Sequence, residues 1–223
     1  MKKESIAVVI ISNGPGELST WVRPVVNSLN KINDSSKKFD RLNFLIRLVL
    51  VPCPNATGSE YEVAKSWNTF ELVTKAKTFW KLLIKPNQYA KWPKKGIVIF
   101  LGGDQLWSIL LAKRLGYLNI TYAEWVSRWP QWTNEIAAMN IKVKELIPKR
   151  YQYKCQIIGD LMADIKLKSE IALQNKEKQY IALLPGSKKA KLSVGIPFFL
   201  EVADRIAEKN QNINFIIPIA PTT

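Results

Sequence analysis

The feature of this sequence that most limits its fold is a repeated alternation between short apolar runs and amphipathic stretches. The apolar runs are rich in β-branched residues and end at turn residues, which is typical of buried strands: Ile6–Ser12, Phe44–Val51, Gly96–Leu101, Leu118–Tyr122, Cys155–Ile158, Tyr180–Leu184 and Asn214–Ile219. The stretches between them have helical periodicity: Leu18–Lys31, Tyr61–Leu83 (expected to be broken), Gln105–Leu115, Asp160–Leu173 and Leu192–Lys209. Strands that alternate with helices predict βαβ units on a parallel sheet. We therefore expect an α/β fold with a Rossmann-like parallel sheet.

The length of 223 residues allows one to two domains. We expect a first Rossmann-like domain over residues 1–165, a polar linker over residues 166–179, and the beginning of a second Rossmann-like domain over residues 180–223. The second domain has only two predicted strands and one helix. Because these cannot cover both faces of a parallel sheet, we expect this domain to be incomplete.

Composition excludes several function classes. The chain contains no His, so catalytic triads and metal sites that need His are excluded, and acid–base chemistry falls to carboxylates, Lys, Tyr or Cys. Its two cysteines cannot form a disulfide framework or a four-ligand zinc site, which favours a reducing cytosol. No signal peptide or membrane span is recognisable. We expect a cytoplasmic protein.

Two glycine-rich loops follow predicted strands and precede predicted helices. The first contains Asn13, Gly14, Gly16 and Glu17, and its free N–H groups favour an anionic or hydroxyl-rich ligand, although an ordinary tight turn would also explain it. The second ends in Asp104, whose carboxylate can cap the following helix or act as a general base in the crevice. Both loops are expected at the carboxyl edge of the sheet.

Three further stretches have chemical potential. Residues 122–132 contain three Trp, which either pack over the core or line a ligand surface. Residues 75–95 contain seven Lys and no acid among aromatic and aliphatic residues. On an amphipathic helix, this composition would bind anionic lipid. Nucleic-acid binding and a solvated basic face are the alternatives, and the absence of Arg from the segment favours lipid over nucleic acid. Gly186, Ser187 and Lys188 form a turn that suits a diphosphate.

Together these residues resemble lipid-A-disaccharide synthases, which are two-domain glycosyltransferases of the GT-B architecture. Six motifs occur in the family's order: Pro15-Gly16-Glu17, Gly103-Asp104, Tyr122 through Trp132, Leu146-Ile147-Pro148, Ile158 through Asp164, and Leu184-Pro185-Gly186-Ser187-Lys188. The sequence departs from the family at four places. Glu17 replaces Asp, Asn13 replaces Glu, Asp160-Leu161 replaces His-Pro, and Lys191 replaces an acid.

The resemblance implies transfer of acylated glucosamine from a UDP donor to an acylated glucosamine 1-phosphate, without a metal or another cofactor. It implies Asp104 as the catalytic general base. Asn13, Gly14, Gly16 and Glu17 would shape the acceptor site, and Gly186, Ser187 and Lys188 would face the donor diphosphate.

The membrane contact is expected at Lys77, Trp80, Lys81 and Lys85, on the cytoplasmic side of the inner membrane. The implied partners are the two acylated sugar substrates, an anionic membrane surface, and a missing carboxyl-terminal domain or a second copy of the chain, but not nucleic acid. We expect no transfer by the 223-residue chain alone. The alternative is a non-catalytic basic protein that binds anionic lipid or nucleic acid through Lys75–Lys95.

Overall fold

The computed structural model describes residues 4–38, 42–54, 56–165, 179–186 and 189–218, and it divides the chain into two compact units, residues 1–165 and 166–223. The first unit contains a seven-stranded sheet in the order β3-β2-β1-β4-β5-β6-β7. Every neighbouring pair in this sheet is parallel. The expected α/β fold with a Rossmann-like parallel sheet is confirmed.

The strands and helices of the first unit alternate along the chain as follows: β1 (Glu4–Ser12), α1 (Pro15–Glu17), the π-helical turn η1 (Leu18–Val22), α2 (Arg23–Lys38), β2 (Leu42–Leu50), α3 (Glu60–Ser66), β3 (Leu72–Thr74), the 3₁₀ turn η2 (Ala76–Thr78), α4 (Phe79–Ile84), the 3₁₀ turn η3 (Pro86–Gln88), β4 (Lys95–Phe100), α5 (Gln105–Leu115), β5 (Leu118–Ala123), β6 (Glu135–Ala138), α6 (Ile141–Glu145), the 3₁₀ turn η4 (Lys149–Lys154), β7 (Cys155–Ile157) and the 3₁₀ turn η5 (Leu161–Asp164).

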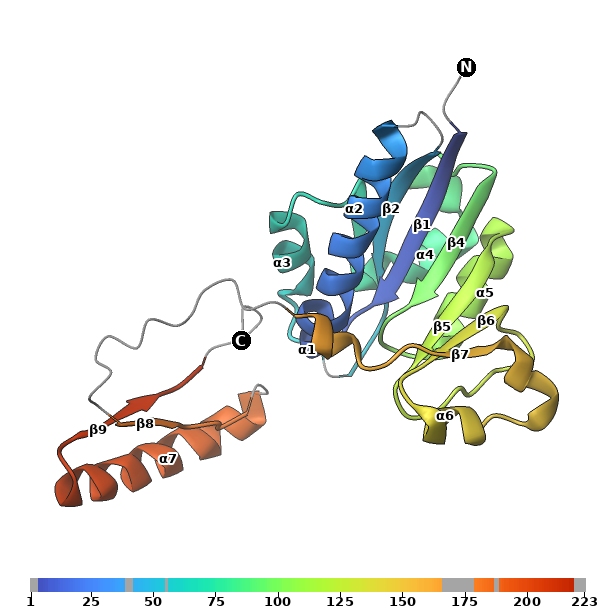
Figure 1. Cartoon of the computed structure of the whole chain (residues 1–223). Helices are drawn as coiled ribbons and strands as arrows, with labels where there is room; N and C mark the ends of the chain where they lie inside the picture. The colour runs from blue at the N-terminus through green and yellow to red at the C-terminus, as the bar shows by residue number, and fades with distance from the viewer. Residues whose placement is uncertain (1–3, 39–41, 55, 166–178, 187–188, 219–223) are drawn as a thin grey trace. The chain divides into compact units, whose positions relative to one another are not determined.

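Helices cover both faces of this sheet (Figure 1). On one face, Val9 and Ile11 of β1 pack with Phe79 of α4 and Leu111 of α5. On the other face, Ile10 of β1 packs in a cluster with residues of η1, α2 and α3. Alternate residues of β1 therefore serve two cores, which explains why this strand is a continuous apolar run.

Two predicted helices differ from the structure, and two observed strands were not predicted. The helix expected over residues 61–83 is divided among α3, β3, η2 and α4, and the short strands β3 and β6 were not predicted. The helix expected from Asp160 begins as one 3₁₀ turn, with the Asp160 carboxylate accepting a hydrogen bond from the Met162 N–H at 2.9 Å. Its continuation over residues 166–173, like residues 166–178 of the expected linker, lies outside the described residues.

The second unit contains β8 (Gln179–Ala182), α7 (Lys189–Lys209) and β9 (Ile213–Ile216). The two strands pair in parallel, and the Leu183 N–H extends the ladder to the Ile216 carbonyl at 2.8 Å. All four residues of β9 are half-buried, and Val194 and Phe198 of α7 are exposed. Its described residues thus form one strand–helix–strand unit with a two-stranded parallel sheet.

Candidate functional site

The strand order reverses between β1 and β4, and ligands of open α/β sheets bind at such a point, beyond the carboxyl ends of the strands. The Ser12 hydroxyl donates to the Leu101 carbonyl at 3.2 Å and so joins the ends of β1 and β4. Gly103 has a φ of +89°, and a Cβ there would lie 2.6 Å from Val51. The loop after β4 therefore needs glycine at this position, both for its backbone conformation and for the close approach of β2.

A cavity of about 240 Å³ lies at this edge. Its polar and aromatic lining comes from three segments of the first unit: Glu17 and Trp21 after β1, Gly102, Gly103 and Gln105 after β4, and Tyr122, Glu124, Trp125 and Arg128 at and after β5. The rings of Trp21 and Tyr122 meet edge to face at 5.2 Å. Carboxylates, a guanidinium and aromatic rings around one small cavity suit a hydroxyl-rich ligand such as a sugar.

Gln105 holds the Trp-rich loop against the start of α5. Its amide Nε2 donates to the Val126 carbonyl at 2.8 Å, and its Oε1 accepts from the Arg128 N–H at 2.8 Å. Both bonds are made by a side chain that is only 9% exposed. The two bonds position the backbone next to Trp125. The sequence analysis missed this role of Gln105 because its partners are more than twenty residues away along the chain.

Asp104 caps α5, as the sequence allowed. Its Oδ1 accepts from the Leu106 N–H at 2.9 Å, and its Oδ2 lies 3.7 Å from Nη1 of Arg128. The carboxylate is 46% exposed and is not among the residues that line the cavity. Its place beside the cavity leaves one oxygen open to solvent and to the guanidinium.

Glu124 is the carboxylate in the cavity wall that the sequence did not single out. Burial raises its pKa above the ordinary value of 4.5, and the nearby negative charges of Asp160 and Glu17 raise it further, while a hydrogen bond from the Trp125 side chain acts in the opposite direction. Burial likewise raises the pKa of the Tyr122 phenol. A carboxylate in a cleft with a raised pKa is a candidate for proton transfer. Only the position of Glu124 directly after β5 could have indicated it.

The four predicted acceptor residues do not line one cavity. Glu17 lines the cavity described above. Asn13 is buried, donates from its Nδ2 to the Val51 carbonyl, and lines a different cavity of about 320 Å³ with Tyr61 and Lys75. Gly14 lies against the Glu17 carboxylate, and Gly16 is exposed.

Of the predicted diphosphate residues, Gly186 has a φ of +102°, as a tight turn before α7 requires. Ser187 and Lys188 lie outside the described residues.

The basic segment, residues 75–95, does not form the single amphipathic helix on which the lipid-binding interpretation depends. It is divided among η2, the six-residue α4 and η3, because Phe79 and Leu82 point into the core and Pro86 interrupts the helix. All seven lysines are exposed, and so are Trp80 at 49% and Ile84 at 64%. The predicted contact residues Lys77, Lys81 and Lys85 therefore flank the two exposed apolar side chains in sequence, but they do not share one helix.

Within the described ranges, no helix is long and apolar enough to cross a membrane. No group of three or more acidic or Cys side chains that could hold a metal ion occurs among the residues that the structure describes.

A comparison with curated proteins finds a lipid-A-disaccharide synthase from Psychromonas ingrahamii, 30% identical over 141 residues. The chain is similar to lipid-A-disaccharide synthases. This confirms the resemblance drawn from the six motifs. The matched part covers 54% of this chain and 37% of that enzyme, so the chain spans well under two thirds of this relative. No protein-family model matches the chain.

Solved structures agree on the fold. UDP-GlcNAc 2-epimerase from Methanocaldococcus jannaschii matches with a TM-score of 0.55 at 14% identity, over 98% of this chain and 66% of that one. UDP-GlcNAc 2-epimerase from Neisseria meningitidis, solved bound to UDP-GlcNAc, matches with a TM-score of 0.56 at 13% identity, over 96% of this chain and 66% of that one. At these identities the likeness shows the Rossmann-like fold alone.

Proposed function

We propose that this chain is the acceptor-side part of a glycosyltransferase related to lipid-A-disaccharide synthase. The reaction is transfer of acylated glucosamine from a UDP-linked donor to an acylated glucosamine 1-phosphate. The observation that supports it best is the cavity at the β1–β4 reversal, lined by Glu17, Glu124 and Arg128, in a chain similar to these enzymes. The epimerase structure solved with UDP-GlcNAc supports a UDP-sugar donor.

In this proposal the cavity holds the acceptor sugar, with its hydroxyls on Glu17 and Glu124 and its ring against Trp21. The acceptor hydroxyl oxygen forms a bond to the anomeric carbon of the donor, the bond from that carbon to the UDP oxygen breaks, and UDP leaves with the electron pair. The open Oδ2 of Asp104 accepts the hydroxyl proton. Gly186, Ser187 and Lys188 of the second unit would stabilise the negative charge that develops on the leaving diphosphate.

The test compares Asp104→Asn with Glu145→Gln, a matched change of an exposed carboxylate on α6. Asn caps helices about as well as Asp, so Asp104→Asn should stay folded, yet transfer should fall by about 10²-fold or more because an amide cannot accept the proton. Product formation is measured with a donor-binding domain of a lipid-A-disaccharide synthase added in trans, and no turnover is expected without it. A loss of transfer rate below about threefold would show that Asp104 is not the general base. Turnover by the chain alone would contradict the proposal that it supplies only the acceptor side.

We also propose that the protein works in the cytoplasm at the inner membrane surface, which it touches through Lys77, Trp80, Lys81 and Lys85. Two exposed apolar side chains near these lysines, Trp80 and Ile84, support this contact. Each lysine near an anionic surface contributes up to about 1 kcal/mol to binding. The triple change of Lys77, Lys81 and Lys85 to Glu should abolish flotation with phosphatidylglycerol vesicles and preserve the far-UV circular dichroism spectrum. Unchanged flotation would refute the membrane contact.

A further inference from the structure

A further cavity, of about 580 Å³, lies at the amino edge of the sheet, where the parallel strands begin, and it shares no residue with the candidate active site. It lies among the start of β1, the middle of β2, and the segment that leads into β4. Its charged lining consists of Arg47, Lys91, Lys94 and Lys95 against the single carboxylate of Glu71. The cavity is therefore strongly cationic, and its size is within the range of small-molecule sites.

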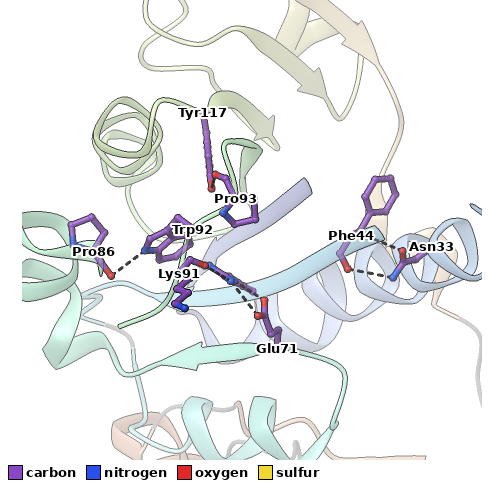
Figure 2. Close-up of polar contacts among 9 residues, drawn as sticks. Asn33, Phe44, Glu71, Pro86, Lys91, Trp92, Pro93 and Tyr117 are labelled. Atoms are coloured by element: carbon purple, nitrogen blue, oxygen red, sulfur yellow. Dashed lines mark hydrogen bonds and ion pairs between the residues drawn. The ribbon is translucent and has the colours of Figure 1, made fainter. Parts of the chain in front are cut away.

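The buried side chain of Arg47 forms a fixed wall of this cavity, while the exposed lysines supply its excess positive charge. The side chain is 2% exposed, and its Nε donates to Glu71 Oε2 at 2.8 Å, while Nη2 donates to Glu71 Oε1 at 3.2 Å and to the Lys91 carbonyl at 2.8 Å. Its guanidinium carbon lies 4.5 Å from the centre of the Trp92 ring. Figure 2 shows Glu71, Lys91 and Trp92 gathered at this point. The guanidinium is thus fixed in place before any ligand arrives.

One donor of this guanidinium has no acceptor. Nη1 of Arg47 is buried and makes no hydrogen bond with any of the residues that the structure describes. An unsatisfied buried charged donor is costly, and a native structure retains one only for a reason. Trp92 covers the guanidinium and is itself held by a bond from its indole N–H to the Pro86 carbonyl at 3.0 Å.

We propose that this amino-edge cavity binds a phosphate group, either free or in a lipid headgroup. Nε and Nη2 of Arg47 are taken by Glu71 and the Lys91 carbonyl, so Nη1 is the guanidinium donor left for a phosphate oxygen. The lysines at the rim add point charges that suit a dianion. The spare Nη1 donor of Arg47 is the group that would gain an acceptor. The site is independent of the proposed sugar transfer, because it lies at the opposite edge of the sheet.

The experiment is isothermal titration calorimetry of the 223-residue chain with inorganic phosphate at low chloride. The test variant is Lys91→Glu/Lys94→Glu, which leaves the backbone carbonyl of Lys91 available to Arg47. The matched control is Lys142→Glu/Lys149→Glu, which makes the same charge change at exposed positions on α6 and η4. Wild type should bind phosphate saturably, the test variant should bind at least about tenfold more weakly, and the control should bind within about twofold of wild type.

Arg47→Lys is the second variant. It keeps the charge but loses the Nη1 donor, so a folded Arg47→Lys protein should also bind phosphate more weakly than wild type. Absence of saturable binding to wild type, or an equal loss in the test and control variants, would overturn the proposal, since the attraction would then be that of net charge alone.

A vesicle arm separates the two sources of phosphate. Flotation with phosphatidylcholine vesicles that contain phosphatidic acid is compared with and without competing inorganic phosphate. Competition by phosphate, together with loss of flotation in Lys91→Glu/Lys94→Glu, assigns the cavity to a lipid headgroup. Flotation that is insensitive to both, beside saturable calorimetric binding, assigns it to a soluble phosphate compound.

Discussion

The two edges of the seven-stranded sheet place charge in opposite ways. At the amino edge, the buried guanidinium of Arg47 meets the Glu71 carboxylate and the Trp92 ring, so most of its charge is compensated within the fold. At the carboxyl edge, Glu124 lies in a cavity wall, and burial, together with the nearby charges of Asp160 and Glu17, raises its pKa and so opposes its ionisation. The first arrangement stabilises the sheet, whereas the second costs stability and is typical of a site kept for function.

The largest effect on stability is expected for Arg47→Met. The substitution leaves Glu71 and the Lys91 carbonyl without their donor and removes the stack on Trp92. Breaking a buried pair costs about 3–5 kcal/mol, and because Glu71 is 46% exposed and can be hydrated, we expect a loss of about 2–3 kcal/mol in urea unfolding.

The matched control for Arg47→Met is Arg114→Met. Arg114 is exposed and donates to the Leu83 and Ile84 carbonyls at 3.1 and 2.9 Å, so its removal should cost less than about 1 kcal/mol. Similar losses for the two variants would show that burial of Arg47 adds nothing and would remove the contrast between the edges.

A smaller effect is expected at the carboxyl edge for Gln105→Ala. It removes the two bonds that hold the backbone of Val126 and Arg128, at a cost of about 1–2 kcal/mol in thermal unfolding. Amide hydrogen exchange should accelerate over residues 124–132 and stay unchanged in β1. Gln131→Ala, an exposed side chain in the same loop, is the control and should change neither measurement. Uniform acceleration across the sheet would mean that Gln105 supports the whole fold rather than the loop.

Local signals account for what the sequence predicted well. The helix α5 was predicted at its observed bounds, and Asp104 caps its start as the sequence allowed. In the structure the helix ends at Gly116, which has a φ of +71°. The strand β3 was missed because it lies within the stretch that has helical periodicity, and β6 because it contains only one β-branched residue. Pairing with β2 and β5 places both strands in the sheet.

The location of the candidate site was predictable from the sequence, but the side chains that hold it in place were not. Both glycine-rich loops were predicted at the carboxyl edge, and the structure joins them there through Ser12 and Leu101. The roles of Gln105 and Arg47 depend on contacts between residues more than twenty positions apart, which no local pattern encodes. The lipid-binding interpretation of the basic segment assigned its apolar residues to a surface, whereas Phe79 and Leu82 complete a core.

The smallest effect is expected for Glu124→Gln, and it depends on pH. Because the pKa of Glu124 is raised in the folded state, its protonated form is favoured by folding, and that contribution is fully present below the ordinary value of 4.5 and is lost as the pH rises through the folded pKa. Above that pKa the ionised carboxylate opposes folding. Glutamine carries no charge, so the variant should melt at a slightly higher temperature than wild type at pH 7, and the difference should vanish at pH 4.

Glu135→Gln, an exposed carboxylate at the start of β6, is the control for Glu124→Gln and should show no such dependence. If Glu124 binds the acceptor sugar, the same stabilised variant should also have a higher KM for the acceptor in the transfer assay, since an amide accepts hydroxyl hydrogen bonds less strongly than a carboxylate. A Glu124→Gln protein that is less stable than wild type at pH 7 would show that the folded protein stabilises the ionised carboxylate of Glu124. The charges at the two edges would then both be compensated within the fold.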